Sequence, residues 1–275
     1  MGWLLSCRAG NSYPPSALPD DPTAAESASA ALRPLVAVAT YNEAENIEAM
    51  VAAIREAVPQ ADVLITDDAS PDGTGAIADR LAAADVQVTV NHRAGKLGLG
   101  TAYLAAFEHV GRSGHDVLVT LDSDLSHDPE RIPDLLAPIA AGEADLVIGS
   151  RYVEGGGIEG WPRSRHLMSG AVNRYTRLLF GTRVRDCSGG FRAYRADGLA
   201  EIDWSRQVAK GYAFLEEVLF RCEAAGLRVA EVPIVFRDRI KGESKISLAE
   251  ATSAIRDLAW VCLRDRVGRA GTRRP

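Results

Sequence analysis

Long apolar runs are absent from this sequence. No window of about 18 or more uncharged apolar residues occurs, so no helix of the chain is expected to span a membrane. An excess of positive charge is absent as well, because the formal net charge is −6 at pH 7. The chain therefore has no global field that would recruit nucleic acid, and it must hold any anionic ligand with local arginines and lysines.

Cysteine is scarce and scattered along the chain. The cysteines form no CxxC pair and no cysteine/histidine spacing typical of zinc ligands; they are Cys7, Cys187, Cys222 and Cys262. Thiols placed in this way are typical of a reducing compartment, so we expect a cytoplasmic protein without structural zinc. Residues 8–33 are rich in Ala, Ser, Pro and Asp, and we interpret residues 1–33 as a flexible leader.

Glycine is missing from the turn after the first predicted strand. The apolar run from Pro34 to Thr40 predicts a buried strand, and the residues that follow it read YNEAENI. A dinucleotide site of the Rossmann type needs the glycines of GxGxxG directly after this strand. That class of cofactor site is therefore excluded.

Strand and helix patterns alternate through the first half of the chain. An alternation at about thirty-residue spacing is typical of an α/β fold with a mostly parallel central sheet flanked by helices. The predicted strands begin at Pro34, Ala61, Val86 and Asp116, and the predicted helices cover residues 43–58, 74–84 and 98–110.

Polar clusters follow three of these predicted strands. They are Tyr41 to Glu43, Asp67 with Asp68, and Asp122 to Asp124. Parallel strands end at the same edge of a sheet, so we expect the clusters to converge on one rim. Two carboxylates at positions i and i+2 of an extended segment share a face and repel each other unless a cation lies between them. A solvated Asp-Ser-Asp turn is the alternative interpretation.

A series of short motifs follows one another along the chain. The motifs are TYNEAENI, DDASPDGT, GKLGLGTAY, LDSDLSHDP, GSRYVEGGGIEGW, DCSGGFRAY, KGYAFLEE and EVPIVFRDRIKGESKIS. Together and in this order they resemble the dolichyl-phosphate or polyprenol-phosphate mannosyltransferases, which are inverting glycosyltransferases with the nucleotide-sugar-binding GT-A fold. The resemblance covers roughly residues 34–249, which we expect to form the catalytic domain, and residues 250–275 are expected to form an amphipathic helix and tail.

The resemblance implies transfer of mannose from GDP-mannose to a polyprenyl (dolichyl-type) monophosphate, with inversion at the sugar carbon. In this family the acidic pair that matches Asp122 and Asp124 coordinates a divalent ion, Mg²⁺ or Mn²⁺, which bridges the donor diphosphate. Some relatives have glutamine where this chain has Ser126, so water is the expected substitute for a third protein ligand.

The resemblance also implies donor contacts at the rim. Glu43 matches the family's first nucleotide contact, and the acidic cluster after the second strand is expected near the base and ribose. From the residues alone, Glu43 has the alternative role of a charge at a helix N-terminus, and Asp68 that of a turn cap with Ser70 and Asp72. The expected donor-binding residues are Tyr41, Glu43, Asp67, Asp68, Lys96, Asp122, Ser123, Asp124, Arg239 and Lys245.

Arginines in the second half match the family's acceptor site. Arg151, Arg165 and Ser169 are expected to hold the lipid phosphate, because a guanidinium donates to phosphate in a planar fork. Arg239 and Lys245 match a clamp over the donor diphosphate and, with Asp124, form the expected catalytic set. The alternatives are a solvent-facing helix charge for Arg165 and a solvated basic surface for the clamp.

The acceptor chemistry sets two further expectations. A phosphate monoester is largely ionised at neutral pH, so no general base is required. The lipid implies peripheral association with the cytoplasmic face of a membrane, through the amphipathic segment with Leu258 and Val261 near its apolar side, or through a separate membrane-anchoring protein. A helix packed on the catalytic core is the alternative for that segment.

Two other functions share many of these motifs. One is a polyprenyl-phosphate glucosyltransferase that uses UDP-glucose, and the other is a non-catalytic protein that binds nucleotide sugars. Loss of the acidic pair or of the clamp is typical of the second class, and both are present in this sequence.

Overall fold

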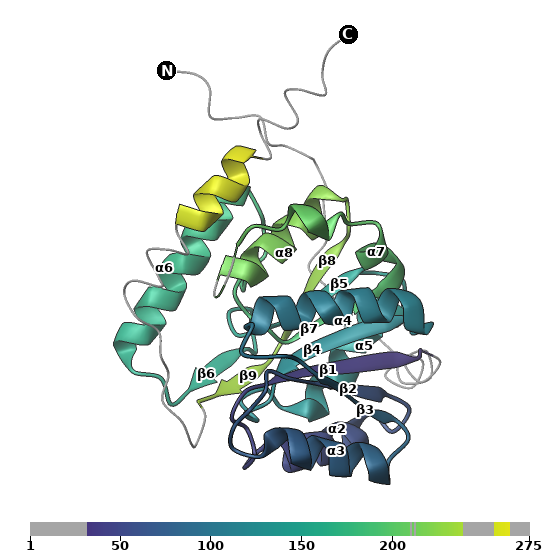
Figure 1. The fold of residues 1–275 in the computed structure, drawn as a ribbon. Coiled ribbons are helices and arrows are strands. Elements are labelled where there is room, and N and C mark those ends of the chain that lie inside the picture. Colours follow the sequence, from purple (N-terminus) through teal and green to yellow (C-terminus); the bar gives the residue numbers. More distant parts are fainter. Residues whose placement is uncertain (1–31, 210, 212, 239–255, 265–275) are drawn as a thin grey trace, which may run out of the picture.

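The computed structural model describes residues 32–209, 211, 213–238 and 256–264 (Figure 1). Most of the predicted leader lies outside these residues. Its last two residues belong to the fold, since Leu32 packs against the hydrophobic core and the backbone amide of Arg33 donates to Asp116 at 2.9 Å. The folded part therefore begins at least two residues before the expected boundary.

A seven-stranded sheet, in the order β3-β2-β1-β4-β7-β5-β8, forms the centre of the described chain. β7 runs antiparallel to both of its neighbours, and the other pairs are parallel. This arrangement is the mostly parallel sheet that the sequence predicts. The strands are β1 (Pro34–Thr40), β2 (Asp62–Asp67), β3 (Val88–His92), β4 (Val117–Asp122), β5 (Leu146–Ser150), β7 (Arg192–Arg195) and β8 (Val229–Pro233).

Helices cover both faces of the sheet. One face packs against α2 (Ile47–Ala57), α3 (Thr74–Ala84) and α5 (Ile132–Ala140), which follows the short helix η1 (Pro129–Arg131). The other face packs against α4 (Leu99–Ser113), α7 (Ala196–Ala200) and α8 (Ala213–Ala224), with the short helix η2 (Trp204–Arg206) beside them. The predicted helices in the first half are α2, α3 and α4, so these predictions are confirmed.

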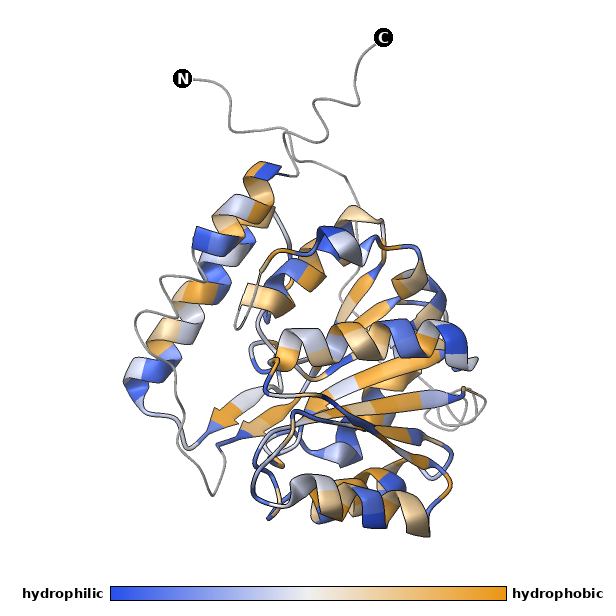
Figure 2. Cartoon of the chain, viewed as in Figure 1, coloured by the Kyte–Doolittle hydropathy of each residue, from blue (hydrophilic) through white to orange (hydrophobic). Residues whose placement is uncertain are grey.

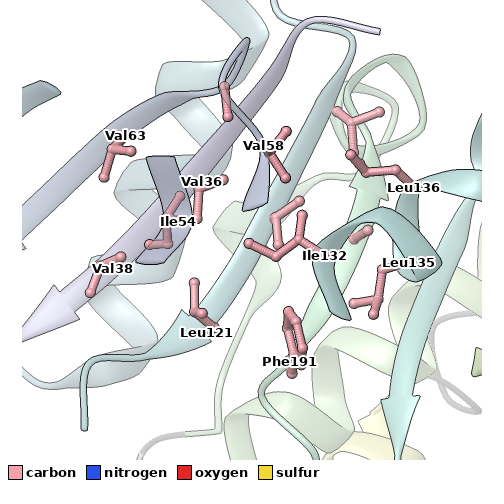
Figure 3. Packing of buried hydrophobic residues seen from close by; sticks show 14 of the residues in the cluster. Val36, Val38, Ile54, Val58, Val63, Leu121, Ile132, Leu135, Leu136 and Phe191 are labelled. Carbon is pink, nitrogen blue, oxygen red and sulfur yellow. The ribbon is translucent and has the colours of Figure 1, made fainter. Parts of the chain in front are cut away.

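Successive residues of the central strands enter different cores. In β1, Val36 and Val38 face the α2 side, whereas Leu35 and Ala37 face the α4 side. Figure 3 shows Val36 and Val38 beside Ile54 of α2. Figure 2 shows that apolar residues run along the strands, as expected when a sheet is buried on both faces.

The carboxyl ends of β1, β2 and β4 lie next to one another. Thr40 is in register with Asp67, and Ala39 is in register with Asp122. The three polar clusters that follow these strands therefore meet at one rim, as predicted.

A separate ribbon and a long helix flank the sheet beside this rim. The ribbon pairs β6 (Gly157–Glu159) with β9 (Val235–Arg237) in parallel. The helix is α6 (Arg163–Phe180), which follows β6 directly and runs along one side of the molecule in Figure 1.

Residues 256–264 form a helix that lies beside α6. Leu258 and Val261 are buried in a cluster that includes Leu179 and Phe180 of α6. The expected membrane-facing role of Leu258 and Val261 is therefore wrong, because this apolar side packs on the protein. Trp260 and Leu263 point outward instead, with 54% and 53% of their surfaces exposed.

None of the helices in the described part of the chain is both long enough and apolar enough to cross a bilayer.

Candidate active site

Strained backbone marks the rim. Among the described residues, the non-glycine residues with positive φ are Asn42 at 61°, Ala69 at 54° and Leu125 at 60°. Each follows the end of β1, β2 or β4 by two or three residues. Asparagine adopts a left-handed backbone readily, but for Ala69 and Leu125 it costs about 1–2 kcal/mol and persists only where the surroundings enforce it. The strain of the described chain is thus concentrated where the polar clusters meet.

The loops after β1 and β2 are tied together. The backbone amides of residues 42–44 donate to the side chains of Ser70, Thr74 and Asp72, at 3.0, 2.9 and 3.0 Å. Ser70 in turn donates from its hydroxyl to the buried carboxylate of Asp67 at 2.5 Å. Asp67 therefore organises the turn that carries the second polar cluster.

Glu43 lies in the turn that leads into α2. Its carboxylate accepts a hydrogen bond from the side-chain amide of Asn46 at 2.7 Å. Its carbonyl oxygen accepts from the amides of Asn46 and Ile47, both at 2.9 Å. The structure thus contains the local, helix-starting arrangement weighed for Glu43, and its contact with a nucleotide stays a prediction.

Asp68 holds the glycine-rich stretch after β3. Its carboxylate accepts from Arg93 at 2.5 Å and from the backbone amides of Leu97 and Gly98 at 3.0 and 2.8 Å. The turn-capping alternative for Asp68 is wrong, because Ser70 bonds to Asp67 instead. Asp68 and Arg93 together shape the loop that carries Lys96.

Lys96 reaches back to the first polar cluster. Its ammonium nitrogen lies 4.0 Å from the centroid of the Tyr41 ring, at the distance of a cation–π contact. Tyr41 follows β1 and Lys96 follows β3, two strands away in the sheet. The contact therefore brings two of the predicted donor-binding residues together.

The acidic pair lies at the end of β4. Asp122 is the last residue of the strand, and its side chain is 38% exposed, so the carboxylate can be reached from solvent. Asp124 accepts from the backbone amide of Ser126 at 3.1 Å, which folds the loop back on itself. Ser123 between them is buried, and the Ser126 hydroxyl is buried without a hydrogen-bond partner among the described residues.

His127 lies directly behind this pair. Its ring is 2% exposed, and its Nδ1 accepts a hydrogen bond from the backbone amide of Asp122 at 3.2 Å. Burial lowers the pKa of His127 and outweighs the nearby carboxylate of Asp122, so the ring is neutral at pH 7. Sequence reasoning passed over this histidine.

Arg151 is held rigidly on the acceptor side. Its guanidinium donates two hydrogen bonds of 2.7 Å to the buried carboxylate of Asp186 and a third, of 3.0 Å, to the hydroxyl of Ser188. Burial alone would lower the pKa of Arg151, but Asp186 outweighs it and raises that pKa. The reciprocal contact lowers the pKa of Asp186 against the effect of burial. The pair is ionised at neutral pH. The carboxylate of Asp122 also raises the pKa of Arg151, so Asp122 lies within electrostatic range of the pair.

Arg165 and Ser169 extend the same region along the first turns of α6. The Arg165 guanidinium stacks on Trp161 at 4.0 Å and donates to Asp238 at 3.0 Å. Ser169 accepts from the hydroxyl of Tyr152 at 2.7 Å, so it lies beside the residue that follows Arg151. The structure therefore gathers the three predicted acceptor residues. The solvent-facing alternative for Arg165 is wrong, because only 16% of its side chain is exposed.

Glu216 is a further buried acid that sequence reasoning did not select. Burial raises its pKa to about 8, and Arg192, Asp186 and Arg151 are its charged neighbours. Its Oε2 has no hydrogen-bond partner within the described chain. The motif KGYAFLEE contained this residue, but no local pattern separates it from Glu217, whose carboxylate accepts from the backbone amides of Val208 and Ala209.

Two predicted residues lie outside the described part of the chain. These are the clamp residues, Arg239 and Lys245. No group of three or more His, Cys, Asp or Glu side chains arranged to hold a metal was found among the described residues.

Solved structures similar to this chain support the fold. The structure of glucosyl-3-phosphoglycerate synthase from Mycobacterium tuberculosis, with Mn²⁺, UDP and glucosyl-3-phosphoglycerate, has a TM-score of 0.62 and 22% sequence identity. The match covers 92% of this chain and 85% of that one. The same enzyme with Mn²⁺, UDP-glucose and phosphoglyceric acid has a TM-score of 0.61 and 21% identity, covering 94% and 86% of the two chains. The predicted glycosyltransferase fold is confirmed.

Curated relatives match at higher identity. The polyprenol monophosphomannose synthase of Mycolicibacterium smegmatis is 46% identical over 239 residues, covering 86% of this chain and 90% of the relative. The undecaprenyl-phosphate mannosyltransferase of Micrococcus luteus is 45% identical over 244 residues, covering 86% and 100%. The resemblance drawn from the motifs is confirmed. The family model described as glycosyl transferase family 2 matches residues 35–203, and this chain belongs to that family.

Proposed function

We propose that this chain transfers mannose from GDP-mannose to a polyprenyl monophosphate, with inversion at the sugar carbon. One observation carries the proposal: a partly exposed acidic pair, Asp122 and Asp124, adjoins Arg151 and Arg165, whose guanidinium groups both lie over the ring of Trp161. The first set suits a metal–diphosphate and the second a phosphate monoester. The relatives from Mycolicibacterium smegmatis and Micrococcus luteus support the sugar and the class of acceptor.

A divalent cation fits the acidic pair. Carboxylate oxygens are the ligands that Mg²⁺ and Mn²⁺ prefer, and the Asp122 side chain is open to solvent. We propose that Asp122 and Asp124 hold this ion, with water and diphosphate oxygens as the remaining ligands. When bound, the ion supplies charge stabilisation to the departing diphosphate.

The donor is proposed to lie over the ends of β1, β2 and β3. Tyr41, Glu43, Lys96 and the two acids Asp67 and Asp68 surround that area. Asp67 and Asp68 also shape their loops, so part of their contribution to donor binding is the form of the loop itself. Ser123, Arg239 and Lys245 complete the proposed donor set, the last two as a clamp over the diphosphate.

The acceptor phosphate is proposed to bind at Arg165, with Ser169 beside it. Arg151 is proposed to attract the phosphate mainly by its positive charge rather than by hydrogen bonds, because two of its donor groups already bind Asp186. The phosphate oxygen is the nucleophile, and it is already ionised at neutral pH. The chain therefore has to position and desolvate the phosphate rather than remove a proton from it.

Access to a lipid acceptor is proposed to come from peripheral binding to the cytoplasmic face of a membrane. Trp260 and Leu263 are exposed on the 256–264 helix, and Arg256 and Arg264 on the same helix are exposed as well. Aromatic and aliphatic side chains interleaved with arginines suit an anionic lipid surface. A separate membrane-anchoring protein is a further proposed partner.

The test is a transfer assay with the full chain and vesicles that contain polyprenyl phosphate. Radiolabelled GDP-mannose, UDP-glucose and GDP-glucose are supplied in separate reactions with Mg²⁺ or Mn²⁺, and the lipid is then extracted. Label is expected in lipid only with GDP-mannose. Label from UDP-glucose alone would make UDP-glucose the donor, and label from none of the three nucleotide sugars would favour the non-catalytic binding protein.

A further inference from the structure

We propose that His127 is a positioning residue for the acidic pair, acting through its hydrogen bond to the backbone of Asp122. This inference rests on the proposed function, because it assumes that Asp122 and Asp124 hold a divalent cation. Nothing in the motif itself distinguishes a histidine that fills the core from one that aims a metal ligand. The contacts of the ring make the distinction.

The first contact is with the end of β4. On its β7 side, the β4 ladder reaches only Thr120, two residues before Asp122. Nδ1 of His127 accepts the amide hydrogen of Asp122 at 3.2 Å beyond that point. The ring nitrogen therefore serves as an acceptor where the pairing of β4 with β7 has ended, although β1 still pairs as far as Asp122, and it fixes the backbone from which the carboxylate projects.

The second observation concerns the carboxylate itself. Oδ2 of Asp122 lies 3.7 Å from the same Nδ1, which is too long for a hydrogen bond. An Nδ1 that accepts from an amide presents a lone pair and has no proton to offer the carboxylate. The ring thus fixes the main chain of Asp122 without neutralising the side chain that is proposed to bind the cation.

The third observation is that the ring itself is immobilised. Phe191 lies 5.4 Å from it, and Phe236 meets it edge-on at 5.3 Å. Phe236 belongs to β9, and the next residue, Arg237, donates its backbone amide to the carbonyl oxygen of Ser126 at 3.1 Å. The acidic loop is therefore held from two sides, by the ring at Asp122 and by β9 at Ser126.

The experiment compares two substitutions of nearly equal shape. His127→Asn keeps a hydrogen-bond acceptor, and His127→Leu removes it. The probe is Mn²⁺ in the presence of GDP, with binding followed by electron paramagnetic resonance on the full chain. His127→Leu is expected to raise the Kd for Mn²⁺ about tenfold or more, as outer-shell substitutions commonly do. His127→Asn is expected to recover most of that loss, and GDP binding without metal is expected to stay unchanged in both variants.

A matched control removes a histidine from the opposite end of the sheet. His115 is also largely buried and bonds to Asp62 and Ser113. His115→Leu is expected to leave the Kd for Mn²⁺ at the wild-type value. If either His127 variant fails to fold, Phe236→Leu loosens the same ring and is expected to raise the Kd several-fold.

The outcomes separate this inference from the function on which it rests. Equal Mn²⁺ affinity in wild type, His127→Leu and Phe236→Leu would show that the ring only fills the core, while the proposed metal site stands. An Asn variant as weak as the Leu variant would also overturn the role of the hydrogen bond. A wild type that binds no Mn²⁺ with GDP would remove the proposed metal site and this inference with it.

Discussion

The two ends of the sheet differ in how they hold their acidic residues. At the amino ends of the strands, acids meet nearby bases: Asp145 receives two guanidinium bonds of 2.9 Å from Arg228, and Asp62 lies 2.8 Å from His115. At the carboxyl ends, Asp68 and Asp186 also bind arginines, but Asp67 and Asp124 accept from a hydroxyl and a backbone amide, in loops with positive-φ backbone. One end is built for stability, and the other keeps acids and strain that stability alone does not require.

The largest expected effect is at the acidic pair. Asp124→Asn is expected to reduce mannosyl transfer by on the order of 100-fold or more, because it removes charge where the leaving diphosphate develops its own. Excess chelator is expected to do the same to the wild type. Transfer of label from GDP-mannose to extractable lipid measures both.

The matched change at the amino end should show the reverse behaviour. Asp145→Asn is expected to leave transfer intact and to lower the free energy of unfolding by about 1–3 kcal/mol, since partly buried hydrogen bonds between charged groups are lost. Full activity of the wild type in excess chelator would contradict the metal role, and an inactive Asp145 variant would erase the contrast between the two ends.

The next effect is at Arg165. Arg165→Ala is expected to lower kcat/KM for the lipid acceptor by about 10–100-fold, the usual worth of a hydrogen bond to a charged group. Binding of GDP-mannose, measured by calorimetry, is expected to change little. Arg228→Ala at the amino end serves as the control and should alter stability instead. A fall in donor affinity as large as the fall in acceptor use would mean that Arg165 does not belong to the acceptor site alone, and its assignment would be wrong.

Glu216 should make stability depend on pH. Burial raises its pKa to about 8, from 4.5 for an ordinary glutamate. Between these values the folded chain holds a proton that the unfolded chain releases, so the contribution of Glu216 to stability is largest below pH 4.5 and is lost as pH rises through about 8. The slope from this residue is up to about 1.4 kcal/mol per pH unit. Urea unfolding at several pH values should show a flatter profile for Glu216→Gln, and identical slopes would remove Glu216 as the cause.

The smallest expected effect concerns the strain. Ala69→Gly is expected to raise the free energy of unfolding by up to about 1 kcal/mol, because glycine adopts a positive φ without steric cost. Ala52→Gly, an exposed site within α2, is expected to lower it by about 1 kcal/mol. Thermal unfolding of both variants tests the sign. A loss of stability in both would mean that Ala69 is not strained.

The sequence predicted the fold well because its signals are local. Alternating apolar runs and helical spacing are legible without tertiary contacts, so β1 to β4 and α2 to α4 could be predicted. The rim followed from a rule of parallel sheets rather than from any single residue. The antiparallel direction of β7 could not be predicted, because a four-residue strand reads alike in either direction.

The candidate site was less predictable in its partners than in its members. Arg151 and Asp186 are 35 residues apart in sequence, so no spacing rule pairs them. His127 was visible in the motif, but its bond to the Asp122 amide exists only once the loop turns through the positive φ of Leu125. The apolar side of the last helix was read correctly as apolar, and only the packing shows that Leu258 and Val261 face the protein.

The antiparallel strand β7 has a consequence for how the molecule assembles. It lies between β4 and β5, which do not pair with each other, and it pairs Arg195 with Val117 and Tyr194 with Leu146. During synthesis β4 therefore has an open edge until residues 192–195 have emerged. The strands that carry the proposed donor half can pair early, but they join the acceptor half only through a late, long-range contact. Joining of the two halves is thus expected to wait for β7.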